Sequence, residues 1–156
     1  MNGLIELVFD GISVHYINGL VCEIIQQGNI LEITGTEVGA IDASRLEHEL
    51  VSMLRNCLVP ASMFLKVDLI EVGGVGISSP LLRILSFEGK GELAVLFEAS
   101  DIDEASRNDA AIKLADGARS LAIKAQAHDF YCGFEPATDR KTRLFSANES
   151  GPVLNI

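Results

Sequence analysis

Apolar and polar positions alternate over the first third of the chain with the period of two that is typical of β-strands. The expected strands are residues 4–9, 12–16, 20–26 and 30–34. Asp10-Gly11 between the first two is a strong hairpin signal, and Gly28-Asn29 joins the last two. A three-residue turn, Ile17-Asn18-Gly19, would keep the apolar sides of both hairpins on one face. The pattern therefore predicts an N-terminal four-stranded meander.

Two later segments have the spacing of amphipathic helices. Asp42 or Ser44 opens the first, in which Ser44 and Glu47 fit a capping box, and Pro60 ends it. Its apolar stripe consists of Leu46, Leu50, Met53, Leu54, Cys57 and Leu58. The second helix is expected from about Ile102 to Ala127, with alanines and leucines at helical spacing that suit close packing on a sheet.

The remaining apolar segments predict more strands. These are residues 64–72, 82–87, 92–98, 130–134 and 143–146. Strands outnumber helices and come in hairpin runs, so the expected class is α+β, with a mainly antiparallel sheet and the two helices packed on it. At 156 residues the chain is expected to form a single domain over 1–156, with a loose tail after about residue 148.

Charge narrows the range of partners. The chain has 12 Lys and Arg against 22 Asp and Glu, a net charge of −10. Such a balance argues against nucleic acid as a partner, because phosphate binding rests on dense cationic contacts. The first half is the more acidic: residues 1–78 hold three basic and ten acidic side chains, and residues 79–156 hold nine and twelve. Solubility explains this distribution as readily as an acidic footprint for a basic partner does.

Several features indicate a reduced, cytoplasmic protein. The first residues have no cationic region, so we expect no signal peptide, and no apolar run is long enough to span a membrane. The three cysteines, Cys22, Cys57 and Cys132, are an odd number and lie far apart, which favours free thiols that pack as small hydrophobic side chains.

No motif dictates a chemistry, so we expect no enzyme activity and no cofactor. His15, His48 and His128 lie far apart without metal-ligand spacing, so no metal site is predicted. The Gly-rich stretch over residues 72–80 follows a strand but lacks the Lys-Ser/Thr ending of a P-loop. A flexible surface loop is the preferred interpretation. The alternative is a small enzyme or ligand-binding domain that uses loop 73–79, with Asp68, Glu71 or His15 nearby.

The C-terminal segment carries a resemblance. Residues 129–146, DFYCGFEPATDRKTRLFS, resemble a strand-turn-strand ending of small bacterial proteins associated with toxin systems. In size, acidity and lack of a signal the chain is also similar to cytoplasmic immunity proteins of polymorphic or contact-dependent toxins. The resemblance implies a protein that binds and neutralises a toxin without chemistry of its own. It assigns no role to any residue.

Together, charge and resemblance favour an immunity-type protein for a cognate basic toxin, such as a nuclease. An upstream reading frame with a basic C-terminal domain would support this interpretation. Acids of the first half would contact the toxin, with exposed Val21, Ile25 and Ile30 as the apolar centre of the interface. The expected partner-binding residues are Glu6, Glu23, Ile25, Glu32, Glu37, Asp42, Glu47 and Glu49. A third interpretation is that the same apolar residues form a homodimer surface.

Overall fold

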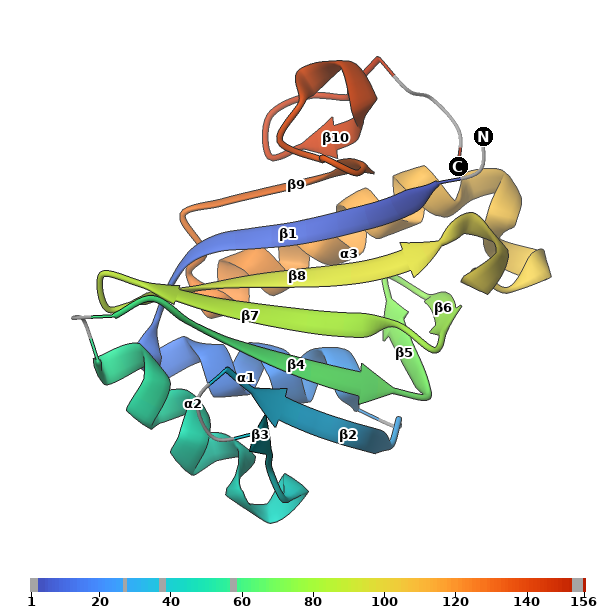
Figure 1. The fold of residues 1–156 in the computed structure, drawn as a ribbon. Helices are drawn as coiled ribbons and strands as arrows, with labels where there is room; N and C mark the ends of the chain where they lie inside the picture. Colours follow the sequence, from blue (N-terminus) through green and yellow to red (C-terminus); the bar gives the residue numbers. More distant parts are fainter. Residues whose placement is uncertain (1–2, 27, 37–38, 57–58, 153–155) are drawn as a thin grey trace.

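An eight-stranded sheet in which all neighbouring strands are antiparallel dominates this computed structural model, which describes residues 3–26, 28–36, 39–56, 59–152 and 156 (Figure 1). The order across the sheet is β10-β9-β1-β8-β7-β4-β2-β3, and β5 and β6 form a separate hairpin. The strands are β1 (Leu4–Ser13), β2 (Ile30–Gly35), β3 (Gly39–Ala40), β4 (Ala61–Val67), β5 (Leu69–Val72), β6 (Val75–Ser78), β7 (Leu81–Phe87), β8 (Lys90–Glu98), β9 (Asp129–Phe134) and β10 (Arg143–Ser146). The α-helices are α1 (Val14–Ile25), α2 (Leu46–Arg55) and α3 (Ala110–Ala125).

The main core lies between the sheet and the helices. Alternate residues of β1, namely Ile5, Leu7 and Phe9, are fully buried, as period two requires of a strand with one covered face. On α2 the buried positions are Leu46, Leu50 and Leu54, which recur every four residues and form one stripe. Buried residues of all three helices belong to the same cluster as these strand residues. The α+β class with a mainly antiparallel sheet is thus confirmed, and the sheet keeps one face free of helices.

The expected N-terminal meander is wrong. Asp10 and Gly11 form a bulge inside the single strand β1, whose pairing with β8 shifts between Phe9 and Ile12. The bulge is favoured because Gly11 takes a φ of +65° and its N–H is accepted by the Asp10 carboxylate at 2.8 Å. The strand expected over 12–16 ends at Ser13, where α1 begins.

Helix α1 replaces the predicted turn at residues 17–19 and the strand over 20–26. Its buried residues are Ile17, Leu20, Val21, Ile24 and Ile25, the i, i+3, i+4, i+7, i+8 pattern of a helix. Some of these residues, such as Leu20 and Ile24, also fit an alternating pattern, which explains why the segment resembled a β-strand. Residues 30–34 do form the expected strand, now β2.

The expected strand over 64–72 is interrupted at Asp68. The carboxylate of Asp68 accepts hydrogen bonds from the backbone N–H and the side-chain amide of Asn29, at 2.6 and 3.0 Å. These bonds hold the pKa of Asp68 below its ordinary value and separate β4 from β5. The Gly-rich stretch that follows is not a flexible loop but the turn and second strand of the β5–β6 hairpin.

Both predicted helices exist with narrower bounds. Asp42 caps the short 3-10 turn Ala43–Arg45 that leads into α2, accepting the Ser44 N–H at 2.9 Å. Helix α3 begins only at Ala110, after a 3-10 segment over Glu104–Asp109. The strands expected over 82–87, 92–98, 130–134 and 143–146 are confirmed as β7 to β10.

Beyond residue 148, Ser150 and Gly151 contact β10. The backbone N–H of Gly151 donates to the carbonyl of Leu144 at 3.0 Å, and Ser150 bridges Phe145 of β10. The burial of the cysteines agrees with the expectation only in part. Cys132 is buried, Cys22 is exposed on α1, and Cys57 lies outside the described residues.

Candidate partner-binding face

The sheet face opposite the helices, here called the open face, carries the side chains that alternate with the core. On β1 these are Leu4, Glu6, Val8 and Asp10. Near β9 the open face is covered by the segment that joins β9 to β10. Ala137 of this segment is fully buried against Val8 and Tyr131. Toward β4 and β2 this cover is absent, and Phe64, Leu81 and Leu85 are half-buried.

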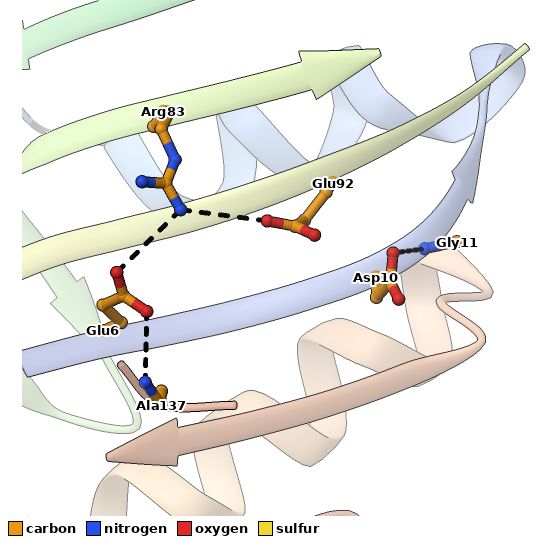
Figure 2. A network of polar contacts seen from close by, with 6 residues as sticks. All are labelled: Glu6, Asp10, Gly11, Arg83, Glu92 and Ala137. Atoms are coloured by element: carbon orange, nitrogen blue, oxygen red, sulfur yellow. Dashed lines mark hydrogen bonds and ion pairs between the residues drawn. The ribbon is translucent and has the colours of Figure 1, made fainter. Parts of the chain in front are cut away.

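Arg83 of β7 lies between two carboxylates at the centre of the open face. Its Nη2 atom is 3.9 Å from Oε1 of Glu6 on β1 and 3.9 Å from Oε1 of Glu92 on β8 (Figure 2). The second oxygen of Glu6 accepts the backbone N–H of Ala137 at 3.3 Å, which ties the covering segment to the network. Strand alternation explains the cluster, since all three residues come from adjacent strands and point to the same side.

Burial and like charge change the acidity of this cluster. Burial raises the pKa of Glu92 above its ordinary value; the nearby charges of Asp10 and Glu6 raise it further, and Arg83 only partly offsets them. The pKa of Tyr131 is raised to about 12, mainly by burial and further by the negative charges of Glu92 and Asp10. The Arg143 guanidinium lies 4.6 Å from the centre of the Tyr131 ring and donates through Nε to the carbonyl of Ala137 at 3.0 Å. Negative potential is therefore concentrated here.

A groove of about 870 Å³ opens at the end of the open face where β7 and β8 meet in their hairpin turn. Its lining includes Asp10, Ser62, Leu85, Phe87, Lys90 and Glu92. Phe87 is 64% exposed although it is a large apolar side chain. A concave site with an apolar wall and a few convergent charged groups is the usual form of a binding site.

The acids expected to bind a partner do not form one surface. Glu6 and Glu32 lie on the open face, where Glu6 is largely buried and Glu32 is exposed and 3.0 Å from Lys66. Glu23 lies on α1, where it forms an ion pair of 2.9 Å with Lys124 of α3. Glu37 lies outside the described residues.

The other expected residues lie around α2 or in the core. Asp42 is an exposed cap whose pKa is held below its ordinary value by the Ser44 N–H, Glu47 is exposed on α2, and Glu49 pairs with Arg45 at 3.4 Å. The expected apolar centre is wrong: Val21 is fully buried, Ile25 is 8% exposed, and Ile30 is half-buried against the core. The reason is that residues 14–25 form a helix whose apolar stripe faces the sheet.

Sequence reasoning missed Asp10, Arg83, Phe87 and Glu92. Arg83 and Glu92 each interrupt an otherwise apolar strand, at positions that alternate with buried Leu82, Ile84 and Leu93. That interruption was the available signal, because a charged residue within a buried strand must face away from the core or find a partner.

Within the described part of the chain, no three or more His, Cys, Asp or Glu side chains are grouped so that they could hold a metal ion. None of the helices formed by those residues is long and apolar enough to cross a lipid bilayer.

Comparison with known proteins identifies relatives. A search of curated proteins finds no match. Among solved structures, the chain matches one in the 1.75 Å crystal structure of the toxic C-terminal tip of CdiA from Pseudomonas aeruginosa in complex with immune protein. The identity is 23%, the TM-score is 0.79, and the match covers 99% of this chain and 100% of the other. At that identity the likeness establishes the fold. A family model described as PABL017 Cdi1I immunity protein matches residues 3–150, and the chain therefore belongs to this immunity protein family.

Proposed function

We propose that this chain binds a cognate toxin domain in the cytoplasm through the open face of its sheet and neutralises it by covering it, without catalysis. Family membership carries the neutralising role. The choice of surface rests on the open face, where a groove with exposed Phe87 lies beside two carboxylates that share one guanidinium. Exposed apolar area next to charge is the composition expected of a protein interface.

The partner we propose is basic, and a nuclease is the toxin class that fits best. The chain has a net charge of −10, and a basic, phosphate-binding protein is the natural complement of such a surface. An acidic surface is also a poor ligand for nucleic acid itself. This charge argument replaces the one based on exposed Val21 and Ile25, which the fold buries.

The alternative of a ligand-binding Gly-rich loop loses its basis. Gly73 of the β5–β6 turn packs directly against α3, and a Cβ atom added to Gly73 would collide with the carbonyl oxygen of Lys113. The glycine at this position permits close packing of the hairpin on a helix, so a phosphate need not be invoked to explain it.

Two exposed apolar side chains on opposite sides of the molecule provide the test. Phe87 lies in the groove, and Ile123 lies on α3, where it is 71% exposed. Both Phe87→Ser and Ile123→Ser remove apolar area without changing charge. Binding of the C-terminal domain of the cognate toxin, to be identified from the adjacent reading frames, would be measured by titration calorimetry, together with growth protection of cells that produce this toxin.

Phe87→Ser is expected to weaken the association about tenfold or more, because exposed aromatic side chains are frequent hot spots of interfaces. Ile123→Ser is expected to leave it unchanged. The opposite pattern would place the toxin on the helical layer and contradict the proposed surface. Light scattering of the free protein at two concentrations tests the homodimer interpretation, which predicts a mass that rises with concentration.

Two of the acids expected from the sequence to bind the partner provide a second comparison between the open face and the helical side. Glu32→Lys reverses a charge on the open face, and Glu23→Lys reverses one on α1. Only the former is expected to slow association by several-fold at low salt, since steering depends on charge close to the interface. Equal effects of both would indicate that net charge alone steers the encounter.

A further inference from the structure

The groove at the β7–β8 end of the open face carries more negative than positive charge. Asp10, Glu88 and Glu92 line it together with a single base, Lys90. Glu92 continues into the network with Glu6 and Arg83, where one guanidinium faces two carboxylates. Groove and network together therefore contain four acids and two bases.

Arg83 satisfies these carboxylates poorly. Both of its ion-pair distances are 3.9 Å, longer than the 2.7–2.9 Å or so of a charge-assisted hydrogen bond. Its Nε atom is buried without a hydrogen-bond partner in the described part of the chain. Within the same part, Glu92 has no hydrogen-bond donor, and Asp10 accepts a single bond from the N–H of Gly11. Acceptor oxygens thus remain unused beside the groove (Figure 2).

The apolar part of the groove suits the stem of a long side chain. Leu85 and the exposed ring of Phe87 lie on one side of the same space that Asp10 and Glu92 line. An aliphatic stem packs on such a surface while its charged end reaches the carboxylates. An aromatic ring also attracts a guanidinium or an ammonium group through its π-electrons.

From this arrangement we propose that the groove receives an arginine or lysine side chain of the toxin and that Asp10 and Glu92 are the carboxylates that bind its charged end. The inference rests on the proposed function and names the chemistry of the contact. An anion would be repelled, and an apolar group would leave the carboxylates buried without a partner. The cationic end supplies the donors that Arg83 does not provide.

The raised pKa of Glu92 agrees with this occupant. Burial and neighbouring acids disfavour its charged form in the free protein. A cation that enters the groove stabilises that charged form, so complex formation would lower the pKa again.

The test compares two double variants that neutralise the same amount of charge. Asp10→Asn with Glu92→Gln changes the groove and keeps an acceptor for the Gly11 N–H. Asp109→Asn with Asp116→Asn changes two exposed acids of the α3 region, which pair with Lys113 and Arg119. Affinity for the toxin domain is measured for both at the same salt concentration.

The groove variant is expected to bind at least fivefold more weakly than the α3 variant, with the difference mainly in the dissociation rate. A difference below fivefold, with the wild-type protein binding normally, would overturn the groove proposal and leave the proposed function standing.

A second experiment needs no toxin and tests the groove by itself, which matters if the wild-type protein fails to bind the toxin domain. The free protein is titrated with arginine amide and, as an uncharged control, citrulline amide, and backbone NMR shifts are followed at Gly11, Phe87 and Glu92. Saturable shifts with arginine amide alone are expected. If the wild-type protein does not bind the toxin domain at all, the proposed function fails. The shifts with arginine amide then decide whether the groove binds a cation, and an absence of such shifts overturns the groove proposal.

Discussion

The contact between Gly117 of α3 and Gly73 of the β5–β6 turn gives a sharp stability prediction. A Cβ atom added to Gly117 would lie 2.6 Å from the Cα of Gly73, a distance that requires backbone movement. Gly19 of α1 is the control, because a Cβ atom there would meet nothing within 4 Å. In the middle of a helix, alanine is intrinsically more favourable than glycine by about 1 kcal/mol. Gly19→Ala should therefore stabilise the protein by roughly 0.5–1 kcal/mol.

Gly117→Ala receives the same intrinsic gain but must also displace the turn. Overpacking of this kind costs about 1–3 kcal/mol. The two variants should thus differ in free energy of unfolding by about that amount, which corresponds to several degrees in Tm for a chain of this size. Thermal and urea unfolding of both variants would measure it. If Gly117→Ala raised Tm as much as Gly19→Ala does, close packing would not explain the Gly-rich stretch, and the ligand-binding interpretation would regain its basis.

Three further predictions concern one buried and two half-buried side chains. Leu50→Ala on α2 removes a fully buried side chain and should destabilise the protein by about 2–5 kcal/mol, measured by urea unfolding. Arg143→Met removes the contact with the Tyr131 ring and a hydrogen bond to the covering segment. It should lower stability by about 1–2 kcal/mol, and no change in Tm would refute both roles. Because the pKa of Glu92 is raised in the folded state, its ionisation opposes folding at pH 7. Glu92→Gln should therefore stabilise the protein at pH 7 by less than about 1 kcal/mol, since the group is partly exposed, with the gain vanishing below the ordinary carboxyl pKa.

The fold class could be predicted from the sequence because most strands have an unambiguous period. The error over residues 14–25 has a specific cause. In that segment Ile17, Leu20, Val21, Ile24 and Ile25 recur at helical spacing. The β-branched residues nevertheless favour a strand, and the glycine at position 19 favours a turn before it. Packing of the stripe against the sheet decides between them, and tertiary contacts of that kind are not visible in local sequence.

The candidate site was less predictable for a different reason. Arg83 and Glu92 come from the consecutive strands β7 and β8, but Asp10 lies far from them in the sequence, and only the order β1-β8-β7 brings it close to Glu92. Because the sequence pattern paired residues 4–9 with residues 12–16, it gave no indication that β1 pairs with β8, and this cluster could not be inferred. Charge density along the chain indicated Glu6, which does belong to this network. It also indicated Glu23 and Glu47, which are in helices on the other side of the sheet.

The chemical character of the open face fits the proposed interface better than an ordinary solvated surface. A surface selected for solubility alone would expose its carboxylates fully and would not place a 64% exposed phenylalanine next to them. Here Glu92 is partly buried among other acids, so that the free protein carries it at a cost in stability. Such a cost is retained where a bound partner offsets it. If Glu92→Gln raises stability and weakens toxin binding together, the two effects will have a single origin, a half-buried carboxylate that Arg83 neutralises only in part.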